Sequence, residues 1–221
     1  MIKKLFLLSV ILLLTACAAQ RAATEDENRN ISTAKINTQL GMTYLENHNI
    51  SRAKQKLLLA LDEAPNIPDT WYSMGYFLEV TGDKAEANKY YLKALDIAPK
   101  RGDVQNNYGT YLCRSGRYQE SIQHFELAAR DIHYIDTAAA YENAAICAMK
   151  IPDKKLARQF FQKALGSDPG RSNVYLGLAE LDFQTGQLMK AKRNLETFLS
   201  LSAPTTESLS LSHKLQNKGM V

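Results

Sequence analysis

The sequence predicts an all-α fold, built as an array of stacked helix pairs. Pro65 and Pro99 lie 34 residues apart, and similar small and aromatic residues precede each of them at the same distances. Between these prolines, two runs repeat at helical spacing: Trp71, Met74, Gly75, Leu78, and then Ala87, Tyr91, Ala94. Residues three and four positions apart lie on one face of a helix, so each run indicates an amphipathic helix.

Each helix of the pair has a physical reason to begin and end where it does. Gly82 falls between the two runs and marks the turn that joins them. Gly75 and Ala87 have little bulk where the helices must approach closely, and Tyr91 fills the space beside them. Pro99 prevents the second helix from continuing, because proline lacks the amide hydrogen that a helix interior needs.

The same register recurs along most of the chain. It predicts five units, with the boundaries 34–67, 68–101, 102–137, 138–171 and 172–204. A single helix pair cannot bury its apolar face, so stacking of neighbouring pairs supplies the stability. The 34-residue period and these positions resemble the tetratricopeptide repeat, which implies a solenoid in the form of a right-handed superhelix.

Two departures from the period are informative. The register resumes two residues late after the third unit, which places an insertion around residues 131–137. Turns between repeats accept length changes, so we expect a tolerated bulge, with a partner site as the alternative. After the fifth unit, Leu209, Leu211 and Leu215 predict a capping helix within residues 205–221.

The beginning of the chain has the layout of an export signal. Lys3 and Lys4 precede an uncharged run from Leu5 to Ala16, which is shorter than the ~20 residues that cross a bilayer. The sequence Leu14-Thr15-Ala16-Cys17 resembles the lipobox of bacterial lipoproteins. This resemblance implies removal of residues 1–16 and acylation of Cys17, for example with palmitate; an ordinary signal peptide with an incidental cysteine is the alternative.

Several acyl chains would hold such a lipoprotein at the membrane permanently. Ala18 follows the cysteine where an aspartate would imply the inner membrane, so the resemblance implies sorting to the periplasmic face of the outer membrane. The polar residues after Cys17 show no periodicity, and we expect residues 17–33 to form a flexible tether.

Composition argues against several classes of function. The chain has 27 basic and 23 acidic residues, a near balance that does not suggest a nucleic-acid partner. Cys113 and Cys147 fit no metal-ligand spacing. We expect them to be buried, inert thiols, with pairing in an oxidising periplasm as the alternative. The four histidines form no catalytic or metal-binding pattern; they are His48, His124, His133 and His213. We therefore expect that the protein is not an enzyme and binds no cofactor, metal or small-molecule substrate.

In a stacked array the first helix of each pair lines a concave side. Resemblance to the tetratricopeptide family implies that peptide-binding residues occupy fixed places of each unit. These places hold amide, phenol and charged side chains that suit an extended or helical peptide. They are Tyr72, Tyr76, Glu79, Asn106, Asn107, Thr110, Arg114, Glu142, Asn143, Ile146 and Met149.

The lipobox, the tether and the repeats together resemble the type IV pilus biogenesis lipoproteins PilF and PilW. The segments VQNNYGTYLC, GRYQESIQHFELAARD and AAYENAAICAMK carry this resemblance. It implies a pilotin, which binds subunits of the outer-membrane secretin and promotes their localisation and assembly into a ring. A general periplasmic scaffold for cell-wall enzymes or outer-membrane protein assembly is the alternative.

Three points stay open at this stage. The partner could use the groove or the convex face, and the oligomeric state is undetermined. Family members extend to about a sixth repeat, whereas this chain has a capping helix at that place, which leaves any contact made there in question.

Overall fold

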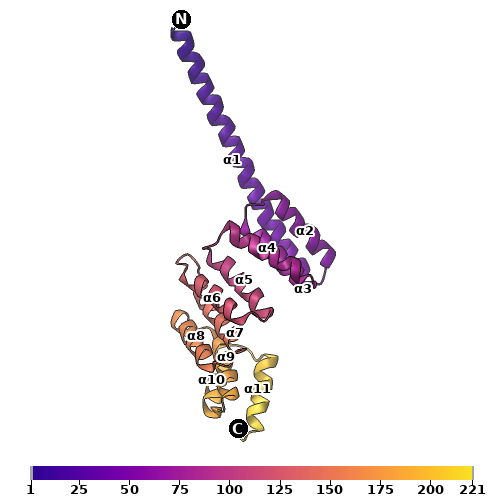
Figure 1. Ribbon diagram of the computed structural model, residues 1–221, viewed down its shortest axis with the longest axis vertical. Coiled ribbons are helices and arrows are strands. Elements are labelled where there is room, and N and C mark those ends of the chain that lie inside the picture. Colours follow the sequence, from indigo (N-terminus) through magenta and orange to yellow (C-terminus); the bar gives the residue numbers. More distant parts are fainter. Residues whose placement is uncertain (1, 221) are drawn as a thin grey trace. The chain divides into compact units, whose positions relative to one another are not determined.

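The computed structural model describes the main chain of residues 2–220 and the side chains of residues 24–220. Its regular secondary structure is helical throughout these residues (Figure 1), which confirms the all-α prediction. The chain divides into two compact units, Met1–Ile97 and Ala98–Val221.

The first unit contains two antiparallel helix pairs. Their helices are α1 (Ile2–Glu46), α2 (Ile50–Glu63), α3 (Pro68–Val80) and α4 (Lys84–Ile97). Leu57, Met74 and Phe77 are buried between them. Gly75 allows α3 and α4 to approach as predicted, because a Cβ atom added there would lie 3.1 Å from the Tyr91 ring. Gly82 turns the chain between the two helices with a φ of 101°, a conformation that glycine adopts at little cost.

The expected flexible tether differs from the structure. Residues 24–33, the part of it with described side chains, are helical and belong to α1, so the prediction of a coil is wrong there. The segment contains no glycine or proline to end the helix, although only Glu25, Glu27 and Arg29 are good helix formers. Ile31 also packs against a small cluster formed by Ala34, Ala60 and Ala64, and this contact favours continuation of the helix. Cys17 and the signal segment lie outside the described side chains.

The second unit contains three helix pairs and a final single helix. The helices are α5 (Gly102–Arg114), α6 (Tyr118–Arg130), α7 (Thr137–Ala148), α8 (Lys154–Ser167), α9 (Ser172–Gln184), α10 (Leu188–Leu201) and α11 (Thr206–Gln216). Phe125, Phe160 and Phe161 lie in one continuous core that joins α6, α7, α8 and α9. Six residues, 131–136, separate α6 from α7, whereas four residues, 168–171, separate α8 from α9. The two inserted residues therefore lie in the connection between helix pairs.

Helix α11 is the predicted capping helix. Thr205 begins it with a capping box, in which its hydroxyl accepts a hydrogen bond from the Ser208 amide and the Ser208 hydroxyl accepts one from the Thr205 amide. Leu211 and Leu215 are buried against α9 and α10, together with Phe198, while Leu209 is 60% exposed. The helix thus covers apolar surface that the last pair would otherwise expose.

Candidate functional site: a groove between three helices

A groove with a volume of about 690 Å³ lies in the second unit between α7, α9 and α11. This volume is typical of sites that bind small molecules or peptide side chains. Three of the predicted residues, Glu142, Ile146 and Met149, line its α7 side. Ile146 is 44% exposed, so an apolar side chain is available on the wall of the groove.

The groove residues on α9 hold the same places within the fifth repeat unit as the predicted residues hold within the second, third and fourth units. Asn173, Leu176, Gly177 and Glu180 line this side of the groove. They hold the second, fifth, sixth and ninth places counted from Ser172. Sequence reasoning missed them because the family positions were carried over to the second, third and fourth units only. Applying the same positions to the fifth unit would have identified them.

The third side of the groove comes from α11 and the residue before it. Thr205, Thr206, Glu207, Ser210 and Lys214 line this side. Hydrogen bonds from the backbone amide of Glu207 and from the side chain of Thr205 lower the pKa of the Glu207 carboxyl. The carboxylate is therefore charged at neutral pH. The groove combines an apolar surface from Ile146, Met149 and Leu176 with charged groups at its edge.

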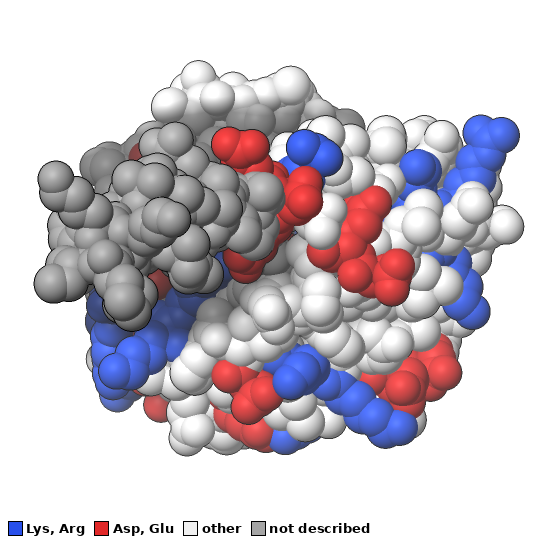
Figure 2. All heavy atoms as spheres, turned by 90° about the horizontal axis from the view of Figure 1, so that it is seen from above, with Lys and Arg blue, Asp and Glu red and all other residues white. Residues whose placement is uncertain are grey.

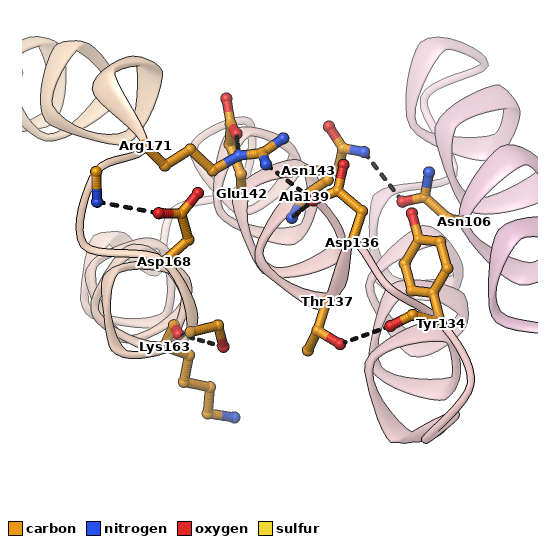
Figure 3. Close-up of polar contacts among 12 residues, drawn as sticks. Asn106, Tyr134, Asp136, Thr137, Ala139, Glu142, Asn143, Lys163, Asp168 and Arg171 are labelled. Carbon is orange, nitrogen blue, oxygen red and sulfur yellow. Dashed lines mark hydrogen bonds and ion pairs between the residues drawn. The ribbon is translucent and has the colours of Figure 1, made fainter. Parts of the chain in front are cut away.

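An ion-paired network holds α7 and α9 in place beside the groove (Figure 3). Arg171, at the start of α9, contacts Glu142 and also donates to Asp136 over 2.8 Å. Burial acts to lower the pKa of Arg171, but its bonds to the two carboxylates outweigh this effect and raise it. Glu142 is thus engaged in positioning two helices, although it lines the groove.

The four predicted residues of α5 lie on a neighbouring part of the same unit. Asn143 of α7 donates to the Asn106 side chain over 3.0 Å and so bridges two first helices (Figure 3). Asn107 donates to the carbonyl of Asp103, and Thr110 to that of Asn106, so both are bonded to their own helix. Arg114 is exposed at the end of α5.

The remaining predicted residues belong to the first unit. Tyr72, Tyr76 and Glu79 lie on α3 and are partly buried. The Tyr72 hydroxyl donates to Asp69, and Glu79 accepts a hydrogen bond from the Tyr91 hydroxyl over 3.2 Å.

Cys113 and Cys147 form a disulfide, which corrects the expectation of two inert thiols. Their Cα atoms lie 5.8 Å apart, within the range of about 4.4–6.8 Å found for disulfides. The physical reason is the repeat itself. The insertion makes the third unit 36 residues long, so Cys113 and Cys147 hold the twelfth and tenth places of their units, and stacking of α5 on α7 brings these places together. The bond ties together two first helices close to the groove.

The surface carries charges of both signs. On the face that Figure 2 shows, Lys and Arg side chains are interspersed with Asp and Glu side chains. Within the described residues, no helix is both long and apolar enough to cross a bilayer.

Family models described as tetratricopeptide repeat match residues 68–101 and 109–172. Together with the helix pairs, these matches show that the chain contains tetratricopeptide repeats. Among its relatives, the type IV pilus assembly protein PilF of Pseudomonas aeruginosa is 27% identical over 177 residues, which cover 80% of this chain and 70% of PilF. An uncharacterized protein of Haemophilus influenzae is 28% identical over 164 residues, which cover 74% of this chain and 90% of that protein.

Solved structures agree with these relatives. The structure of Pseudomonas aeruginosa PilF matches with a TM-score of 0.74 and 25% identity, over 86% of this chain and 85% of PilF. The crystal structure of PilW, described as a widely conserved type IV pilus biogenesis factor, matches with a TM-score of 0.76 and 26% identity, over 85% of this chain and 87% of PilW. The protein is homologous to PilF and structurally close to both PilF and PilW.

Proposed function

We propose that this protein is a non-catalytic pilotin of type IV pilus biogenesis. Homology to PilF and structural similarity to PilW support a role in that process. In this proposal Cys17 carries the lipid that anchors the chain to the periplasmic face of the outer membrane. The repeats bind secretin subunits and promote their localisation and multimerisation there.

The observation that carries the binding part of the proposal is the groove between α7, α9 and α11. Two of its three helices are restrained, because the Arg171 network ties α7 to α9 and the Cys113–Cys147 disulfide ties α7 to α5. Its wall offers Ile146, Met149 and Leu176 to an apolar side chain of a partner. Apolar anchors in a restrained pocket contribute most of the affinity of typical protein interfaces.

Substitution of the two apolar walls tests this assignment. The double variant Ile146→Glu/Leu176→Glu is expected to weaken binding of detergent-solubilised secretin by about tenfold or more, because it places charges where an apolar side chain is buried. Affinity is measured by biolayer interferometry with the full-length protein. Ile146 is 44% exposed but Leu176 is partly buried against the core of α9, α10 and α11, so some loss of thermal stability is expected, and the helical circular dichroism signal checks that the variant is folded.

The matched control is Leu199→Glu on α10, which lies outside the groove and has a similar exposure of 40%. It is expected to leave secretin affinity within twofold. Equal affinities of the groove variant and the control would move the binding site elsewhere on the protein. Retention of cell-wall hydrolases instead of secretin would favour the general periplasmic scaffold.

The anchoring part of the proposal has a separate test. The variant Cys17→Ala is expected to leave secretin subunits unassembled and in the wrong membrane, since the acyl chains that would hold the protein are lost. Membrane fractionation and gels that preserve secretin multimers measure this result. Normal ring assembly in the outer membrane by that variant would contradict the anchoring role, whatever the groove binds.

A further inference from the structure

The six residues between α6 and α7, here called the 131–136 loop, are tied to the helices around them. Both carboxylate oxygens of Asp131 accept backbone hydrogen bonds, one from Gly102 over 2.7 Å and one from His133 over 2.9 Å. These two bonds lower the pKa of the carboxyl group, with the His133 bond contributing most, so it is ionised at neutral pH. One end of the loop is therefore attached to the start of α5.

Two further residues hold the remainder of the loop. Tyr134 packs so closely on Gly102 that a Cβ atom added there would lie 2.5 Å from the Tyr134 Cβ, and burial raises the Tyr134 pKa to about 12. Asp136 accepts a hydrogen bond from the amide of Ala139 at the start of α7 and also pairs with Arg171 (Figure 3). Asp131, Tyr134 and Asp136 therefore restrain the loop at three places along its length.

Two of the residues between these anchors, Ile132 and Ile135, are apolar and exposed to solvent. Ile132 is 91% exposed and Ile135 is 101% exposed, more than any other large apolar residue with a described side chain. A restrained loop loses little conformational entropy when a partner covers it, so such residues are well suited to a binding contact. The insertion that the sequence left as either a bulge or a partner site thus presents apolar surface in a defined conformation.

A pocket of about 320 Å³ opens beside Ile132. Leu127, Pro99 and Ile132 give it apolar walls, and Lys100 and Arg130 lie at its edge. Among the described residues, no hydrogen bond or ion pair engages the side chain of either cation. The carboxylate of Asp131, which also lines the pocket, is already engaged by the two backbone amides.

We propose that this pocket and the 131–136 loop form a second docking surface, separate from the groove, for an acidic peptide segment of a partner protein. The segment inserts an apolar side chain between Leu127 and Ile132, and its carboxylates pair with Lys100 and Arg130. The two unengaged cations define the charge of the partner by complementarity. A concave pocket of this volume fits a protruding side chain of a protein better than the flat surface of a lipid bilayer.

The test uses fluorescein-labelled peptides and the full-length protein in detergent, with binding followed by fluorescence anisotropy. In the parent peptide one leucine is flanked by two glutamates on each side; variants replace the glutamates by glutamine or lysine, or the leucine by alanine. The parent peptide is expected to bind with saturation below about 1 mM, and each variant peptide about fivefold more weakly or worse. Equal binding of the lysine peptide, or no saturable binding of the parent peptide, overturns the proposal.

Protein variants locate the site. Two variants are expected to bind the parent peptide about fivefold more weakly or worse: the double variant Lys100→Gln/Arg130→Gln and the single variant Ile132→Ser. The matched controls Lys155→Gln on α8 and Met189→Ser on α10 change exposed residues outside the pocket and are expected to leave affinity within twofold. Equal effects of test and control variants would overturn the assignment, as would a loss of binding in Ile146→Glu/Leu176→Glu alone.

A lipid surface is the competing occupant. Flotation of the full-length Cys17→Ala chain with vesicles of phosphatidylglycerol and phosphatidylcholine tests it without the proposed anchor. We expect no recovery of the protein with the vesicles. If the protein is recovered with the vesicles and Ile132→Ser abolishes this recovery, the surface binds a membrane and not a peptide, and the proposal is overturned.

Discussion

The variant Arg158→Met is expected to lower the free energy of unfolding by about 3 kcal/mol at pH 7. Arg158 of α8 pairs over 2.5 Å with Asp182 of α9, whose side chain is fully buried and also accepts a hydrogen bond from Asn194 of α10. Methionine preserves the aliphatic length but leaves a buried carboxylate without its counter-ion. This loss of unfolding free energy is at the low end of the usual range for breaking a buried ion pair, because the Arg158 side chain is 29% exposed. Urea denaturation followed by circular dichroism measures the change.

A matched arginine variant separates the loss of the ion pair from the loss of a surface charge. Arg193→Met, an exposed arginine of α10, is the control and is expected to cost less than 0.5 kcal/mol. The same loss of unfolding free energy in both variants would contradict the role given to the pair.

Removal of the disulfide is the second large effect. Cys113→Ala/Cys147→Ala is expected to lower the free energy of unfolding by about 3–4 kcal/mol, because the bond closes a loop between residues 34 apart and limits the unfolded chain. The loop connects α5 with α7 and spans the whole of α6, so its loss affects the core of the second unit. Urea denaturation under oxidising and reducing conditions measures the difference.

Dithiothreitol provides an internal control for this prediction. It is expected to destabilise the parent protein about as much as the double substitution does, and to have no further effect on the double variant. An unfolding midpoint of the parent protein that does not respond to reductant would show that the bond does not contribute to stability.

The helix pairs were predictable because their signal is local. Gly75 and Tyr91 hold positions that only a helix pair explains, and the structure brings them into contact. The capping helix was predictable for the same reason, since Leu211 and Leu215 recur at helical spacing and are buried. The helical tether was not predictable, because the segment has weak helix propensity and polar composition, and the contact of Ile31 with another helix, which no local pattern shows, favours its inclusion in α1.

The binding roles of the predicted residues stay a prediction. Three of these residues, Glu142, Ile146 and Met149, lie together on the α7 side of the groove, because residues at helical spacing share one face of a helix. The contribution of α11 was not predicted, because a capping helix is recognised by what it buries and not by the surface that its other side exposes. Glu142 was expected to contact a partner but is also bonded to Arg171, a residue outside the predicted set.

The sequence by itself determined the repeat register, the two-residue insertion and the helical class, since these depend on spacings within about one period. Tertiary structure alone decided that Cys113 and Cys147 are bonded, that α11 completes a groove with α7 and α9, and that Ile132 and Ile135 face solvent. The physical reason is that stacking brings together residues one or more periods apart. Contacts between them depend on how neighbouring helices pack, which no local pattern encodes.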